Sequence, residues 1–335
     1  MVGMVPALVS AALLILFDRQ TSDIGAVRLE EMTRVRPFEY PVLARLLYLG
    51  ERALSGSILG ISLINVGVGV AGAVAMALLL RRMGADYSLW VAAPLLVLAG
   101  QNWDVITALT IALAMWAWLR GADVDAGVWV GIGTAFKIVP IVLLVPMLAL
   151  GGWRRTLRAA GPAAVLWIAV NLPSVLRNPT AWTFPYKFAS ERTDVRGTLW
   201  AALPLRGGAL NMASLVLLAL CLGAVFVAAA RRRLTFAPAC ALAILAFIGT
   251  NKVWQPHYVL WALPALAICA VGHRWVRGLE WASLLYFADI WRRQPQAFYT
   301  EGLWIVGSLR FVALLAVAVA VVLGSLHKSR VPADL

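Results

Sequence analysis

Two aspartates near the start of the chain stand where a carboxylate can do acid–base chemistry. Asp18 and Asp23 follow directly on an apolar run at 4–17 and open a polar stretch at 18–56. A carboxylate beside the hydrocarbon boundary is partly removed from water, which raises its pKa and suits it to take a proton from a hydroxyl nucleophile. The alternative is an ordinary helix cap, because Asp23 follows a serine and precedes a helical stretch. The residues alone leave both interpretations open.

Two further candidates interrupt apolar runs. Asn102 and Asp104 lie at the tip between two such runs, and an ionisable residue at such a tip is a candidate functional residue. A simple helix cap by Asp104 is the alternative. Lys137 is the only charged residue between Asp125 and Arg154, and a lone lysine there is costly unless it meets an anion, either a phosphate or a neighbouring aspartate. The alternative for Lys137 is an ammonium that reaches the membrane interface.

The polar stretches at 173–207 and 250–258 supply the remaining candidates. The first is rich in aromatic and basic residues, including Arg192, and suits a lid over a polar headgroup, with a solvated amphipathic helix as the alternative. The second holds Lys252, which attracts anions, and His257, which titrates near neutral pH and has a structural role as its alternative. We expect the acidic pair Asp123 and Asp125 only to keep a short loop soluble.

Composition limits the class of protein that these residues serve. The 335-residue chain is 62% hydrophobic and 13% charged, with a mean hydropathy of +0.83. Soluble domains have about 45–50% apolar and about 25% charged residues, so a soluble enzyme, a disordered chain and a disulfide scaffold are excluded. The net charge of +13 would suit a nucleic-acid binder, but the sequence contains no nucleic-acid-binding module, and we expect no such partner.

The basic residues predict the orientation of the chain in a membrane. Apolar segments alternate with short basic clusters at Arg81/Arg82, Arg120, Arg154/Arg155/Arg158, Arg231–Arg233, Arg274/Arg277 and Lys328/Arg330. Short basic loops face the cytoplasm. The stretches 18–56, 101–104, the region of Lys137, 173–207, 250–257 and 292–302 then lie on the extracytoplasmic side. The candidate residues named above therefore share one side of the membrane.

We therefore predict an all-α fold, a polytopic transmembrane bundle of about 10–12 helices that forms one integral-membrane domain over residues 1–335. The apolar segments 88–119 and 126–150 are long for one helix and short for two full spans. Paired short or re-entrant helices lining a cavity would resolve this. One long tilted helix through 126–150 is the alternative. The two long extracytoplasmic stretches are 18–56 and 173–207.

Several short motifs occur in an order that resembles a known family. They are SDI and EYPVL in the first polar stretch, NWD at 102–104, GIGTAFKIVPIVLL around Lys137, NLP with FASERTDVRGTLW, and TNKVWQPHYVLWALP. Together they resemble the C-type membrane glycosyltransferases and, more narrowly, glycosyltransferase family 87, over residues 15 to 290. The family more often has S-P-Q-Y where this chain has Gln255-Pro256-His257-Tyr258.

The resemblance implies a C-type architecture in the plasma membrane and a hexosyl transfer on the extracytoplasmic face. The sugar, expected to be mannose, would pass with inversion from a polyprenyl-phosphate donor to a lipid-linked or cell-wall glycan acceptor. Asp23 would match the general base, with Asp18 in its place if the register differs. Lys137 and Lys252, with Arg192 in the lid, would bind the donor phosphate.

The resemblance also implies which residues would hold hydroxyl groups of the sugar or the acceptor, namely Asn102, Asp104, His257, Tyr258 and Glu39. Because cationic side chains would take the developing phosphate charge, neither a metal ion nor another cofactor is required. The expected partners are the lipid-linked sugar, the acceptor and membrane lipid. Two other functions stay open: a transporter or flippase of lipids or small molecules, for which broken helices also serve, and an inactive relative of the transferases.

Overall fold

The structure is a computed structural model, and it describes residues 41–55, 58–91, 103–192, 197–269, 271–292 and 302–328. Four of the predicted site residues, Asp18, Asp23, Glu39 and Asn102, lie outside these ranges. The candidate base of the first polar stretch therefore stays a prediction.

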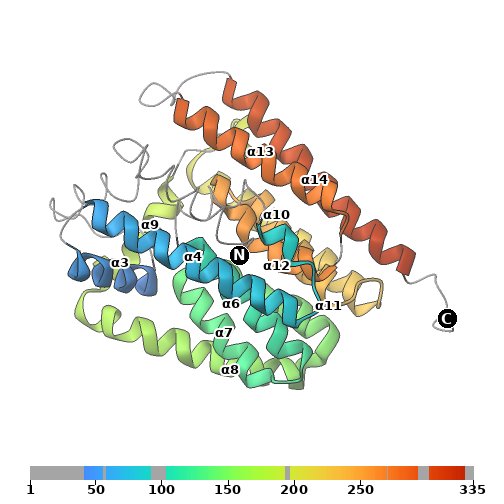
Figure 1. The fold of residues 1–335 in the computed structure, drawn as a ribbon, viewed down its shortest axis with the longest axis horizontal. Coiled ribbons are helices and arrows are strands. Elements are labelled where there is room, and N and C mark those ends of the chain that lie inside the picture. The colour runs from blue at the N-terminus through green and yellow to red at the C-terminus, as the bar shows by residue number, and fades with distance from the viewer. Residues whose placement is uncertain are drawn as a thin grey trace.

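The described residues form α-helices and short 3-10 helices, with no strand among them, which confirms the all-α prediction. The helices are α3 (Val42–Leu54), α4 (Ile58–Arg82), α6 (Asp104–Leu119), α7 (Asp123–Phe136), α8 (Leu144–Arg177), α9 (Pro179–Glu191), α10 (Gly207–Ala230), α11 (Phe236–Thr250), α12 (Val259–Cys269), α13 (His273–Arg292) and α14 (Gly302–Lys328). The 3-10 turns are η2 (Tyr87–Val91), η3 (Val139–Leu143), η4 (Leu199–Ala202) and η5 (Pro256–Tyr258). Figure 1 shows α13 and α14 side by side along one edge of the bundle, with α8 along the opposite edge.

Four stretches within the described residues are long and apolar enough to cross a membrane. They are Leu63–Arg82, Val139–Arg177, Gly207–Ala230 and Ile305–Leu326. The helices α6, α11 and α12 are apolar but shorter than the roughly 20 residues of a full span. These short helices carry most of the fully buried side chains, so they form the interior while longer helices cover them. The chain is thus a multi-pass helical membrane protein with short internal helices, as predicted.

The interior is built from small residues that let helices approach closely. Ala108 of α6, Ala243 of α11 and Ala262 of α12 are all fully buried. At Gly127 of α7, an added Cβ atom would collide with the backbone carbonyl of Ala159 on α8. Small residues are favoured at membrane helix contacts because apolar lipid gives little drive for bulky side chains to associate. This close packing fixes the directions in which α6, α7 and α12 end.

The region 126–150 adopts the broken arrangement, and the long-helix alternative is wrong. Helix α7 ends at Phe136, and Lys137 has an extended backbone with φ −150° and ψ 138°. Pro140, inside the following turn η3, lacks a backbone N–H and so does not continue an α-helical ladder. The break places Lys137 at the end of a helix, at the same end of the bundle as the start of α6.

At the opposite end of the bundle, which we call the basic end, two expectations need correction. The loop expected around Arg154–Arg158 is helical, and within α8 the backbone departs from helix at Gly152, where φ is 73°. Asp123 is buried rather than a solubilising loop residue, and its Oδ1 lies 2.6 Å from Arg155 Nε. The guanidinium of Arg155 also lies 3.8 Å from the centre of the Trp118 ring. Asp123 therefore joins α7 to α8 and to the end of α6.

Candidate functional site

The candidate site is centred on Asp104, the first residue of α6. Its carboxylate is fully buried, and its Oδ1 accepts a hydrogen bond of 2.7 Å from the indole Nε1 of Trp261 on α12. Asp104 lies in the first turn of α6, close to the N–H groups that a helix N-terminus leaves without helical partners. The helix cap considered for Asp104 is not formed, because Trp103 is the N-cap of α6, no side-chain cap hydrogen bond is made, and Asp104 is the first residue of the helix.

Two of the predicted residues converge on this carboxylate. Lys137 Nζ lies 3.6 Å from Asp104 Oδ1, and His257 Nε2 lies 3.1 Å from Oδ2. The side chains of Lys137 and His257 are each 13% exposed, whereas that of Asp104 is not exposed at all. A buried carboxylate is stable only with such partners. The neighbouring aspartate considered as an anion for Lys137 is thus Asp104, and the side chains of Lys137 and His257 keep a small exposed fraction.

Aromatic rings form one wall of this group. Tyr258 stacks on Trp261, with ring centres 3.9 Å apart and planes 22° apart. The Lys137 ammonium lies 6.0 Å from the centre of the Tyr258 ring, at the outer limit of a cation–π contact. Tyr258 and His257 come from the turn η5, and Trp261 lies four residues after His257, in the first turn of α12. We call Asp104, Lys137, His257, Tyr258 and Trp261 the Asp104 cluster.

Lys252 and Arg192, the two other predicted phosphate ligands, lie beside the end of α9. The Lys252 ammonium donates hydrogen bonds of 2.6 Å to the carbonyl oxygen of Ser190 and to Oδ1 of Asn211. Burial lowers the pKa of Lys252, and the nearby charge of Arg192 lowers it further. Arg192 itself lies over the Phe188 ring. Lys252 therefore links the end of α9 to the start of α10 through these two hydrogen bonds. It does not belong to the group of residues around Asp104.

A fully buried arginine that the sequence analysis missed lies on α14. Arg310 lies between two rings, with its guanidinium 4.0 Å from the centre of Trp254 and 3.8 Å from that of Tyr286. Its Nη2 donates hydrogen bonds to the carbonyl oxygens of Gly197 and Trp254, at 3.1 and 2.8 Å. Arg310 thus connects α14 to the segment that follows α9 and to the segment that leads into His257.

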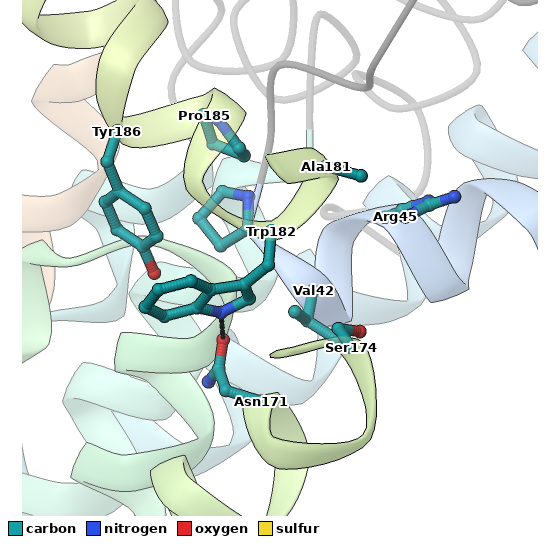
Figure 2. Close-up of a pocket in the computed structure, with 9 residues that line it drawn as sticks. Val42, Arg45, Asn171, Ser174, Ala181, Trp182, Pro185 and Tyr186 are labelled. Atoms are coloured by element: carbon teal, nitrogen blue, oxygen red, sulfur yellow. Dashed lines mark hydrogen bonds between the residues drawn. The ribbon is translucent and has the colours of Figure 1, made fainter. Parts of the chain in front are cut away.

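A shallow pocket opens beside α3, α8 and α9. Figure 2 shows Trp182 of α9 across it, with its indole Nε1 bonded to Oδ1 of Asn171 on α8 at 2.8 Å. Val42 and Arg45 of α3 form the facing wall. The described part of 173–207 adjoining this pocket is helical, which agrees with the amphipathic-helix alternative at 179–191. Helix α3, which lines the pocket, also lies near the Asp104 cluster, because Tyr48 of α3 packs on Trp103, the residue before Asp104.

Within the described ranges, no group of three or more His, Cys, Asp or Glu side chains lies in a position to hold a metal ion. The metal independence expected from the sequence stays a prediction. Asp123 and Asp125, which have the spacing of a D-x-D motif, lie at the start of α7, at the basic end.

Comparisons with known proteins identify no family for this chain. No protein-family model matches it, and no curated protein matches it significantly. One solved structure, the crystal structure of ArnT from Cupriavidus metallidurans bound to undecaprenyl phosphate, aligns with a TM-score of 0.43 and 17% identity. The alignment covers 97% of this chain and 72% of that one. A likeness at this TM-score does not indicate a shared function.

Proposed function

We propose that the protein is a C-type membrane glycosyltransferase that moves a sugar, mannose by preference, from a polyprenyl-phosphate donor to a lipid-linked or cell-wall glycan acceptor. The observation that carries the proposal is the Asp104 cluster. A lysine and a histidine, both partly exposed, are held at one end of the bundle by a carboxylate that is itself fully buried. This arrangement presents the Lys137 ammonium to an anionic ligand, with His257 beside it, while it keeps the Asp104 carboxylate away from that ligand.

The chemistry needs a base on one side of the sugar and cations on the other. The acceptor hydroxyl would give its proton to Asp23, or to Asp18, as its oxygen bonds to the anomeric carbon. The bond from that carbon to the phosphate oxygen then breaks, and polyprenyl phosphate leaves with one more negative charge. Charge-assisted hydrogen bonds from Lys137 to the phosphate stabilise that charge. His257 and Tyr258, beside Lys137, would hold hydroxyl groups, as would Asn102 and Glu39.

Lys252 and Arg192, which lie beside the end of α9, are the two other phosphate ligands of the proposal. Both lie at the point where the helix ends, and the Lys252 ammonium already bonds two oxygen acceptors there. A phosphate could compete for these donors if the end of α9 moves away. The site would lie at the extracytoplasmic face of the plasma membrane, because the basic clusters occupy the opposite ends of the same helices.

The test is a transfer assay on the purified full chain in liposomes, with a labelled mannosyl polyprenyl phosphate and a glycolipid extract as acceptor. Wild type should release polyprenyl phosphate and label the acceptor. Asp23→Asn should lower the turnover by about 10²- to 10⁴-fold, the range for removal of a general base. Glu31→Gln, in the same polar stretch, is the matched control and should keep full turnover.

The outcomes separate the alternatives. Loss of turnover in Asp18→Asn but not in Asp23→Asn would move the base to Asp18, and full turnover in both would refute the assignment of a base. If wild type transfers no sugar from any polyprenyl-phosphate donor, the transferase proposal is wrong. Movement of the labelled lipid between leaflets under those conditions would instead identify a flippase.

A further inference from the structure

A second buried carboxylate, which the proposed reaction does not use, lies in the last turn of α3. Glu51 is 2% exposed. Its Oε1 accepts a hydrogen bond of 2.9 Å from the indole Nε1 of Trp103, and its Oε2 accepts one of 3.0 Å from Nδ2 of Asn65 on α4. Both oxygens are therefore committed to donors from two other parts of the chain. Such a charge is costly to bury, so its retention points to a role that an apolar side chain would not fill.

Helix α3 holds Trp103 in two ways. Besides the bond from Glu51, the Tyr48 ring, one turn earlier on the same side of α3, meets the Trp103 ring edge-to-face at 6.3 Å and 70°. Tyr48 and Trp103 are both almost fully buried. The indole thus has a fixed position and a fixed rotation, because the ring contact sets its plane and the N–H bond sets its direction.

Trp103 directly precedes Asp104 and is the N-cap of α6. Its backbone sets where the first turn of α6 begins and, with it, the direction of the Asp104 side chain. The Asp104 carboxylate in turn fixes Lys137 and His257. Displacement of a catalytic group by about 1 Å can cost about 10²-fold in rate, so a shift at Trp103 would affect the reaction although Trp103 touches no reacting atom.

We propose that Glu51 is a positioning residue of the same site, acting through Trp103 to aim Asp104 at Lys137 and His257. The inference rests on the proposed function for its kinetic consequence. It also means that α3, the end of the first polar stretch, is coupled to the Asp104 cluster. In the sequence, α3 follows the candidate bases Asp18 and Asp23 within the same polar stretch.

The kinetic test is a double-mutant cycle. Glu51→Gln replaces one acceptor oxygen by an NH2 group that faces an N–H donor, and it should lower kcat about 10-fold or more, with a smaller change in the KM of the donor. In the Asp104→Asn background the same change should have little further effect, because Glu51 acts through Asp104. Trp103→Phe, which keeps an aromatic ring but removes the indole N–H, should reproduce the loss. Arg45→Gln, which changes an exposed side chain on the same helix, should keep kcat within about twofold.

A readout that needs no catalysis separates failure of this inference from failure of the proposed function. The indole N–H of Trp261 bonds Asp104 Oδ1, so its ¹⁵N–¹H resonance, assigned with Trp261→Phe, reports the position of Asp104. Glu51→Gln should move this resonance, and Arg45→Gln should leave it. An unmoved Trp261 resonance in Glu51→Gln would refute the positioning role whether or not wild type transfers sugar. Multiplying kinetic losses in the cycle would refute it as well, because they would show that Glu51 and Asp104 act independently.

Discussion

Replacement of Lys137 by methionine tests the centre of the proposed site. Methionine keeps an unbranched apolar side chain but removes the ammonium, which lies 3.6 Å from Asp104 Oδ1. The change has two separable consequences. The ligand loses a cationic donor, and the buried Asp104 carboxylate loses a counter-ion.

The magnitude of each effect, on ligand binding and on folding stability, follows from these contacts. A hydrogen bond to a charged group is worth about 1.5–3 kcal/mol, so the Kd for a polyprenyl phosphate should rise about 10- to 150-fold. Removal of one partner from a buried ion pair costs about 3–5 kcal/mol of folding free energy. Because Trp261 and His257 still face Asp104, we expect the lower end, about 3 kcal/mol.

The assay measures binding of undecaprenyl phosphate and thermal unfolding in the same detergent. Lys137→Met should lose both affinity and stability. The double variant Lys137→Met/Asp104→Asn removes the orphaned charge as well, so it should recover stability but not affinity. Lys187→Met is the control, since Lys187 is 70% exposed and pairs only with the exposed Glu191 among the described residues. A Kd for Lys137→Met within twofold of wild type would refute a phosphate-binding role for Lys137.

Three further variants test the packing around the site. Gly307→Ala should lower the free energy of unfolding by about 1–3 kcal/mol, because its Cβ would lie 2.5 Å from Gly197 Cα; thermal unfolding measures this. Arg155→Met should cost about 3 kcal/mol in the same measurement, because it leaves the buried Asp123 carboxylate with the weaker partner Arg158, at 3.7 Å. Lys252→Met should speed trypsin cleavage within α9 about 10-fold or more, because the end of that helix loses two charge-assisted hydrogen bonds.

Each of these variants has a matched control. Gly324→Ala, also on α14, adds a Cβ that meets no atom within 4 Å and should leave unfolding unchanged. Arg154→Met removes an exposed arginine next to Arg155 and should change neither the unfolding nor the cleavage of α9. Equal losses in Gly307→Ala and Gly324→Ala would contradict the close approach of α14 to Gly197. A cleavage rate in Lys252→Met equal to that of wild type would show that Lys252 does not fasten α9.

The grouping of Asp104, Lys137 and His257 could be predicted from the sequence because the basic clusters fix which helix ends share a side. The same rule did not reveal which atoms meet, since Trp261 reaches Asp104 across 157 positions of sequence. One signal for Trp261 was present: it lies four residues after His257, close enough in the chain for both side chains to reach the same carboxylate. The side of the membrane on which a helix end lies follows from local charge. Which side chains meet depends on how the helices are rotated relative to each other.

The remaining differences have the same physical origin. The charge of Lys252 predicts an anionic ligand, but it does not predict the partner Ser190, which lies 62 positions away on a helix whose position no local pattern specifies. Asp123 looked like a loop residue because its partner Arg155 lies on another helix. Arg310 could have been found, since it is the only charged residue between Glu301 and Lys328, as Lys137 is in its own stretch. The rule that a lone charge in an apolar run needs a partner applies to both.

The position of Arg310 has a consequence for how the protein is made. An arginine in a membrane helix costs up to about 2.5–3.5 kcal/mol, the value at the helix centre, when the helix enters the bilayer from the translocon. Its described partners, Gly197, Trp254 and Tyr286, all precede it in the chain, so they are synthesised before α14 emerges. The carbonyl oxygens and rings that accept the guanidinium are therefore available when the last helix arrives. The described partners of Arg310 thus all emerge before α14, and their contacts with the guanidinium define one register of α14 against the rest of the bundle.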